Sequence, residues 1–168
     1  MITALFGLGL ALLVYAAVHD VAVRTVPNSV SALVLLIGFG LRLLEHDLLP
    51  ALLAALLVFI ALFGIWTLGL MGGGDVKLWA ATTLLVPPGW RPQLMFLADV
   101  MLLGGILGLL YLFLSLVVGK PAASREGSRL TRALRTERWR IRRRGPLPYA
   151  CAIAGGALVA ILPRFFET

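Results

Sequence analysis

Two acidic residues, Asp20 and Asp75, stand at the ends of long apolar segments. An Asp at membrane depth costs about 2.5–3.5 kcal/mol on insertion scales, so each one raises a question of function. Two carboxylates that meet in a partly dry cleft cannot both ionise comfortably and share a proton. The ionised member can then take a proton from water while the protonated member donates to a carbonyl oxygen, which suits peptide hydrolysis. The sequence therefore predicts a catalytic pair, if the fold brings the two acids together.

The residues around Asp75 favour a substrate-accessible setting. Gly72, Gly73 and Gly74 precede the acid, and Lys77 follows it. Each glycine disfavours a helix by about 1 kcal/mol, which predicts a break here. Irregular backbone at membrane depth is tolerated where it is buried in protein or lines a wet cavity, and glycines let another main chain approach closely. A plain flexible linker is the alternative.

The segment after Asp20 predicts a helix end, a turn and a new helix start. Pro27 keeps the residue before it out of the helix, and Asn28 or Ser29 can cap the next helix. Arg24 follows Asp20 by four residues, so it can pair with the carboxylate if the first helix persists that far. A salt-bridged turn at the membrane interface is the alternative role for this segment.

The remaining reactive side chains form no second candidate site for catalysis or metal binding. Asp99 stands alone near the end of an apolar run, which favours a structural or interfacial role. His19 and His46 fall on opposite sides in the predicted topology, and Ser115 has no partner in its segment. Cys151 is the single cysteine, so the chain has no disulfide framework, and a buried small residue is its expected role. We expect no metal and no cofactor.

The composition predicts an all-α, polytopic membrane protein. Of 168 residues, 60% are hydrophobic and 14% charged, whereas soluble domains average about 45–50% and 25%. Apolar runs of about 18 residues cross a bilayer. The first run has no Lys or Arg ahead of it, so we expect a retained span rather than a signal peptide. We expect a single domain, 1–168, with six candidate spans: 2–18, 29–44, 48–71, 76–88, 94–118 and 147–163.

The segment 76–88 is the weakest of these spans, because as a helix it reaches only about 20 Å. The positive-inside rule favours counting it. With all six segments crossing and the N-terminus outside, Asp20 and Asp75 both face the cytoplasm at similar depth. The cytoplasmic side then carries 12 of the 15 basic residues: Arg24, Lys77, Lys120 and the nine arginines between 125 and 144.

Most of the net charge of +7 lies in a basic cytoplasmic loop, 119–146. In a chain this apolar, such a loop suits anionic lipid headgroups and topology determination rather than nucleic acid. Leu130, Leu134 and Ile141 recur at spacings of four and seven, which fits an amphipathic helix at the interface. A solvated charged loop fits the pattern equally well.

Both acidic motifs resemble those of a known family, the type IV prepilin peptidases, which are membrane aspartyl peptidases with a Gly-x-Gly-Asp motif. The motif here is residues 72–75, extended by Lys77. The family's first acid also stands at a helix end before an Arg and a Pro-Asn pair. The likeness covers most of the chain, and the matching residues of the first motif and of the last span are Asp20, Arg24, Pro27, Asn28, Pro148 and Tyr149.

The resemblance implies removal of a short basic leader from prepilin or pseudopilin precursors, ahead of a hydrophobic helix. The site would face the cytoplasm in the inner membrane of a prokaryote, with Asp20 and Asp75 as the catalytic pair. The small size is similar to the short peptidases that serve tight-adherence pili. Larger members also methylate the new N-terminus and carry Cys-x-x-Cys pairs in the first cytoplasmic loop. Here that loop is short and contains no cysteine, so we expect neither methyl transfer nor zinc.

A second class of function stays open from the residues alone. A small transporter, or a non-catalytic subunit of a pilus or secretion assembly, could use Asp20, Asp75 and Lys77 as an ion path or a packing network. Such a protein would support transport or assembly without shortening any pilin.

Overall fold

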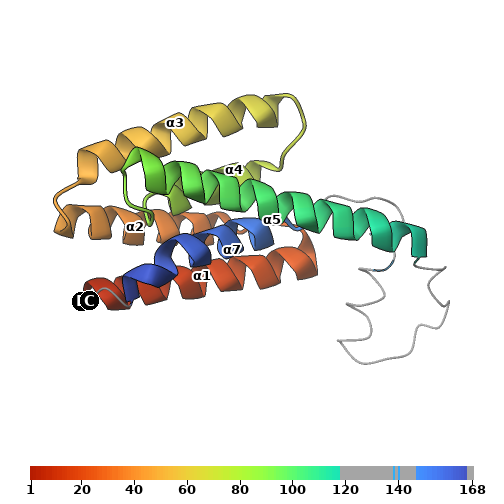
Figure 1. Cartoon of the computed structure of the whole chain (residues 1–168), viewed down its shortest axis with the longest axis horizontal. Coiled ribbons are helices and arrows are strands. Elements are labelled where there is room, and N and C mark those ends of the chain that lie inside the picture. Colours follow the sequence, from red (N-terminus) through yellow and green to blue (C-terminus); the bar gives the residue numbers. More distant parts are fainter. Residues whose placement is uncertain (118–137, 139, 141–146, 166–168) are drawn as a thin grey trace.

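The computed structural model describes residues 1–117, 138, 140 and 147–165. These residues form α-helices and one short 3₁₀ turn, without a strand among them, as Figure 1 shows. The prediction of an all-α membrane fold is confirmed. The elements are α1 (Ile2–Val23), α2 (Asn28–Leu44), α3 (Leu48–Thr67), α4 (Gly73–Thr83), α5 (Trp90–Val117), α7 (Tyr149–Ile161) and η1 (Leu162–Phe165).

Successive helices run back and forth along one direction (Figure 1). The start of α1, the α2–α3 turn and the end of α7 lie at one end of the bundle. The connections from α1 to α2 and from α3 to α4 lie at the other end. This alternation places the last turn of α1 and the first turn of α4 at the same end.

Three helices, α1, α3 and α5, are long and apolar enough to cross a membrane, and α2 and α7 are shorter apolar helices. The helix α4 is the exception. It has 11 residues, which reach only about 16 Å. The prediction of a span over 76–88 is wrong in its bounds, because the helix starts at Gly73 and ends at Thr83. It packs against α2, α3 and α7, so α4 is a core helix of the bundle.

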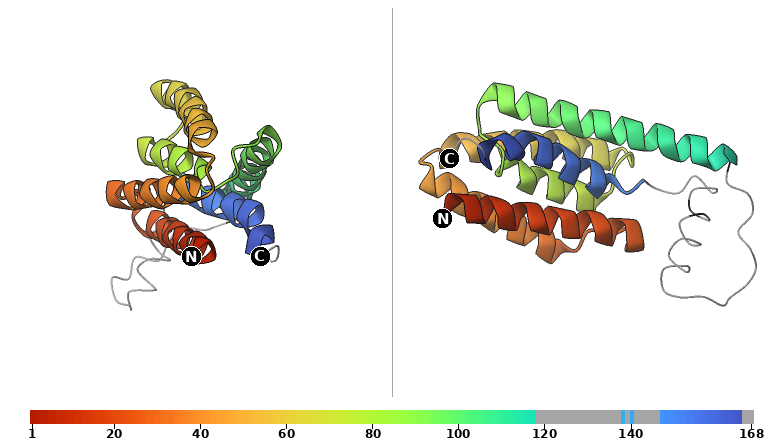
Figure 2. Two further views of the ribbon diagram at one scale, coloured as in Figure 1. Left: turned by 90° about the vertical axis from the view of Figure 1, so that its left-hand side faces the viewer. Right: turned by 60° about the horizontal axis from the view of Figure 1, so that its bottom comes forward.

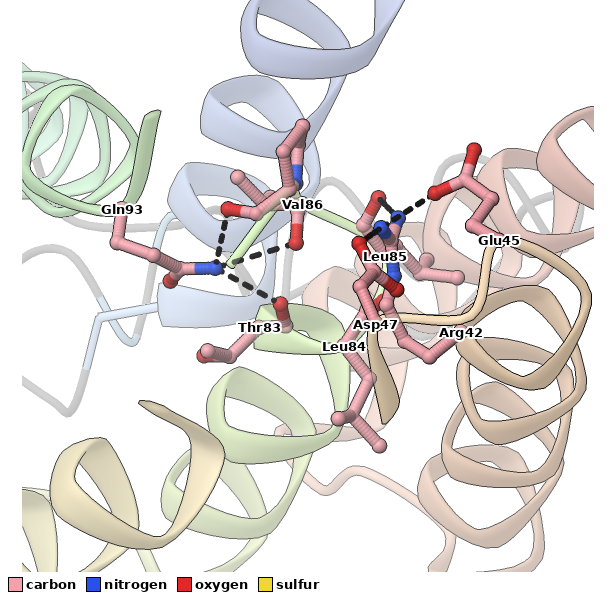
Figure 3. A network of polar contacts seen from close by, with 9 residues as sticks. Arg42, Glu45, Asp47, Thr83, Leu84, Leu85, Val86 and Gln93 are labelled. Carbon is pink, nitrogen blue, oxygen red and sulfur yellow. Dashed lines mark hydrogen bonds and ion pairs between the residues drawn. The ribbon is translucent and has the colours of Figure 1, made fainter. Parts of the chain in front are cut away.

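The chain beyond α4 stays buried without being helical, so its carbonyl groups need donors from elsewhere. Arg42 of α2 supplies them. Its side chain is completely buried, and it donates to the Leu84 carbonyl at 2.8 Å and to the Leu85 carbonyl at 3.2 Å. Figure 3 shows the same guanidinium paired with Glu45 and, at 3.0 Å, with Asp47. A charge buried in this way is held by partners on every side.

Gln93, in the first turn of α5, closes the same end of α4 from the other side (Figure 3). Its side-chain nitrogen lies 3.2 Å from the Thr83 carbonyl, 3.1 Å from that of Val86 and 3.0 Å from that of Pro87. Side chains from α2 and α5 thus supply hydrogen-bond donors to the carbonyl groups at the end of α4.

Glycines set the close packing of α7 on α5. A Cβ atom at Gly156 would lie 2.5 Å from Cγ2 of Val100 and 3.1 Å from its backbone nitrogen. One at Gly155 would lie 2.8 Å from Cδ1 of Leu103. Small residues at membrane helix interfaces allow such approach, which replaces the hydrophobic driving force that lipid removes. The two glycines thereby let the middle of α7 lie close against α5.

Candidate active site

Asp20 lies in the last turn of α1 and is only 4% exposed. The packing of α7 against α1 covers it. The backbone N–H of Ala150 donates to Asp20 Oδ2 at 3.2 Å. Because Ala150 is in the first turn of α7, the carboxylate also faces the positive end of that helix. The N–H donor and the helix end stabilise a negative charge on Asp20, whereas its burial opposes that charge.

Asp75 lies in the first turn of α4, three residues after the N-cap Gly72. Its carboxylate folds back against that glycine. A Cβ atom at Gly72 would lie 2.8 Å from Asp75 Oδ2, closer than real Cβ contacts allow. A glycine at this position therefore leaves room for the orientation that the acid adopts.

The predicted break at the glycines lies earlier than expected. The chain turns over 68–72, and Gly73 and Gly74 are already helical. Their missing side chains serve internal packing. A Cβ at Gly73 would lie 3.2 Å from Nε1 of Trp66, and one at Gly74 would lie 3.3–3.5 Å from atoms of Val26. The chain does break between α3 and α4, as predicted, but Gly73 and Gly74 lie beyond the break, because tertiary contacts offset their low helix propensity.

Arg24 ends α1 in a left-handed conformation, with φ 63° and ψ 33°. Its backbone N–H donates to the Asp20 carbonyl at 2.7 Å. Its guanidinium donates to the Tyr111 hydroxyl at 3.1 Å, and its Cζ lies 5.4 Å from the centre of that ring. Arg24 therefore reaches across to α5, while its charge still acts on Asp20.

Pro27, Asn28 and Lys77 join the first turn to the start of α4. Pro27 is the N-cap of α2 and offers no side-chain hydrogen bond there, so the predicted cap by Asn28 or Ser29 is wrong. The Asn28 side-chain oxygen instead accepts a hydrogen bond from Lys77 Nζ at 3.2 Å. This contact ties α2 to α4 on the outside of the bundle.

The two acids meet at a cavity of about 900 Å³. Asp20 and Asp75 both line it, and the charge of Asp20 acts on Asp75. Arg24 and Gly72 line it too. The other predicted site residues lie outside its lining: Pro27, Asn28, Gly73, Gly74 and Lys77.

Two tyrosines line the cavity, and little in the sequence marks them as site residues. Tyr111 is an aromatic residue within an apolar run, and only the fold brings it to Arg24. Tyr149 was marked by the resemblance alone. Its ring stacks on Trp79 with centres 5.9 Å apart, and a Cβ at Gly104 would lie 2.8 Å from its hydroxyl oxygen. These contacts hold the phenol at the wall of the cavity.

The predicted basic loop, 119–146, lies outside the described residues except for Arg138 and Arg140. Arg140 Nη1 donates to the carbonyl oxygens of Val21 at 3.0 Å and Ala22 at 3.2 Å. A cation at the C-terminal end of α1 is favourable for the helix dipole.

The other reactive residues lie apart from the cavity. Asp99 is half-buried on α5. His19 Nδ1 lies 2.8 Å from the Thr25 carbonyl oxygen, and Cys151 Sγ lies 3.7 Å from that of Ala17. Within the part of the chain that the structure describes, no group of three His, Cys, Asp or Glu side chains could hold a metal ion.

Apolar helices around two carboxylates in a common cavity define a helical membrane protein with a diacid site. The sequence model of the type IV leader peptidase family matches residues 7–113, a span that includes both acids. The chain belongs to this family and is a peptidase of the membrane, which confirms the resemblance. Comparisons with curated proteins and with solved structures gave no match.

Proposed function

We propose that this chain is an aspartyl endopeptidase that removes the basic leader from prepilin or pseudopilin precursors. Asp20 and Asp75 would form the catalytic pair. The observation that carries the proposal is that both carboxylates line one cavity although they come from different helices. Membership of a leader peptidase family supports the reaction class.

The surroundings of the acids support a division of roles. Asp20 accepts the Ala150 N–H at the start of α7, so we assign it the negative charge. Asp20 takes a proton from water as the water oxygen adds to the scissile carbonyl carbon. Asp75 donates its proton to the carbonyl oxygen. When the C–N bond breaks, Asp20 returns its proton to the leaving nitrogen, and Asp75 recovers the proton of the hydroxyl.

The neighbouring residues serve as support in this scheme. Arg24, held by Tyr111, keeps a positive charge beside Asp20. The pair of Lys77 and Asn28 fixes the start of α4, and with it Asp75, against the first turn. The residues that connect α1 to α2 are 24–27 and contain no cysteine. We therefore propose proteolysis without methyl transfer.

The membrane arrangement is part of the proposal. Placing the N-terminus outside puts the acids on the cytoplasmic face of the inner membrane of a prokaryote, and the basic loop 119–146 on the same face. There the loop would contact anionic lipids.

The test is cleavage of a co-expressed prepilin, read from the mass of its N-terminus. Asp20→Asn and Asp75→Asn should each lower the cleavage rate by about 10²–10⁴-fold, since each removes one proton-transfer group. Asp99→Asn removes an acid that does not line the cavity, and it should leave cleavage unchanged. Full cleavage by either of the first two variants would contradict the assignment.

The alternative is a transporter or a non-catalytic assembly subunit, in which Asp20, Asp75 and Lys77 form an ion path or a packing network. The position of Lys77 bears on the ion path. Lys77 bonds to Asn28 and does not line the cavity. Normal pilin processing in both Asp variants, together with a defect in transport or assembly, would restore this alternative.

A further inference from the structure

The cavity that holds the acids is a groove with helical walls. One wall is α3, with Ala61 and Ile65, and the other is α5, with Leu97, Met101 and Leu112. Seen from the end of the bundle, α3 and α5 stand apart, as the left view of Figure 2 shows. The wall residues remain open to the outside, since Ile65 is 40% and Met101 59% exposed. The groove therefore opens sideways, where the bilayer lies.

Charge is confined to one end of this groove. Its charged residues are Asp20, Arg24 and Asp75, close to the α1–α2 connection. The remaining lining residues of α3 and α5 are apolar apart from Tyr111, and two of them, Ala61 and Gly108, have small side chains or none. Small residues on such walls let a helix approach closely. The groove thus fits a molecule that is polar at one end and apolar along its length.

The length of the groove matches a membrane helix. On α5 its lining runs from Leu97 to Leu112. Fifteen helical steps span about 22 Å, which is most of a hydrocarbon core of about 30 Å. A helix that lies along α5 would keep its apolar side chains at the depth they occupy in lipid.

We propose that this groove binds the apolar transmembrane helix of the precursor, which enters sideways between α3 and α5. This inference rests on the proposed function. The helix lies along α5 and its N-terminal end reaches Asp20 and Asp75, where the chain unwinds and is cut. A polypeptide is the occupant that fits, because the acids need a peptide bond and the apolar walls continue directly from them.

Two adjacent residues of α5 provide a matched test. Met101 lines the groove, whereas Leu102 does not, and their side chains are 59% and 63% exposed. Cleavage is measured for a purified prepilin in liposomes and for a synthetic peptide that spans its cleavage site but lacks the apolar segment. Met101→Trp should lower kcat/KM for the prepilin about tenfold by filling the groove, and should lower it much less for the peptide, which lacks the apolar segment. Leu102→Trp should change neither rate.

Cross-linking provides a second measurement that does not depend on turnover. A photoreactive benzoylphenylalanine replaces Met101 or Leu102 in the Asp75→Asn chain, mixed with prepilin in liposomes. We expect cross-links to the apolar segment of the prepilin from position 101 and few from position 102. Equal cross-links from both positions, or products from position 101 with lipid or a second copy alone, would overturn the groove proposal.

The two proposals fail in different ways. If the unmodified protein cuts neither substrate, the proposed function fails. If it cuts the prepilin but Met101→Trp behaves like Leu102→Trp, and the two positions cross-link alike, only the groove fails. A loss of both substrates with Met101→Trp, without a selective cross-link from position 101, also counts against the groove.

Discussion

At the scale of single residues, the two acids are held by different means. Asp20 is fixed by a backbone donor from another helix, the N–H of Ala150. Asp75 has room for its orientation because Gly72, three residues before it, has no side chain. The first arrangement favours a charged carboxylate, and the second leaves the other carboxyl free to face the cavity. The asymmetry of the pair thus comes from its immediate neighbours.

The role of Gly72 can be tested with one methyl group. Gly72→Ala places a Cβ 2.8 Å from Asp75 Oδ2, closer than real Cβ contacts allow, so the carboxyl must rotate away. Cleavage should fall about 10- to 100-fold, since small misplacements of reacting groups are costly. The protein should stay folded, because φ at this residue is −71°, which alanine adopts readily. Prepilin processing and thermal unfolding in detergent measure the two effects.

A matched control is available on α2. A Cβ at Gly40 would have nothing within 4 Å, so Gly40→Ala should leave processing unchanged. Full activity of the Gly72→Ala protein would show that the position of Asp75 does not depend on this glycine.

At the scale of elements, the short helix α4 depends on its neighbours at both ends. At its start, Lys77 bonds to Asn28 of α2. At its end, Arg42 and Gln93 bind the carbonyl groups that follow the helix. An 11-residue helix in isolation would be marginal, so these contacts and its burial maintain it. The orientation of Asp75 therefore rests on contacts from two other helices, α2 and α5.

Removing Arg42 should destabilise the bundle. Arg42→Leu leaves the buried carbonyls of Leu84 and Leu85 without their donors, which we expect to cost about 2–4 kcal/mol in the free energy of unfolding. The control is Arg91→Leu. Arg91 is exposed at the start of α5, with its Cζ 5.2 Å from the Trp90 ring centre, so its loss should cost under about 0.5 kcal/mol. Denaturant unfolding in detergent compares them, and equal stabilities would contradict the capping role.

At the scale of the whole molecule, alternating helix directions decide that the two acids meet. The end of α1 and the start of α4 lie at one end of the bundle, and the α2–α3 turn lies at the other (Figure 1). Neither the order nor the length of the helices alone brings Asp20 and Asp75 to one cavity. The shared cavity also depends on α7, which packs on both α1 and α5.

Sidedness can be measured by cysteine labelling with a reagent that does not cross membranes. In a Cys151→Ala background, Thr25→Cys and Leu70→Cys should react from one face, and His46→Cys from the other. The three residues are exposed and lie in the connections at the two ends of the bundle. By the positive-inside rule, positions 25 and 70 should be cytoplasmic. Labelling of all three from the same face would overturn the alternating arrangement.

The sequence predicted the helices and both acids because each depends on local information. Apolar runs of bilayer length mark helices wherever they occur. An Asp beside glycines or before a turn signals a special site in an apolar chain. The same reasoning misplaced the bounds of α4 and the cap of α2. Those features depend on contacts with residues far away in the chain, such as Arg42 for the end of α4 and Lys77 for Asn28.

The sequence by itself determined an all-α membrane protein with two candidate carboxylates, through composition and local motifs. Only the tertiary structure decided that Asp20 and Asp75 share a cavity, that the Ala150 N–H holds one of them, and that α3 and α5 form its walls. The physical reason is the low-dielectric interior. Buried polar groups must find partners there, and those partners come from whichever helix packing brings close.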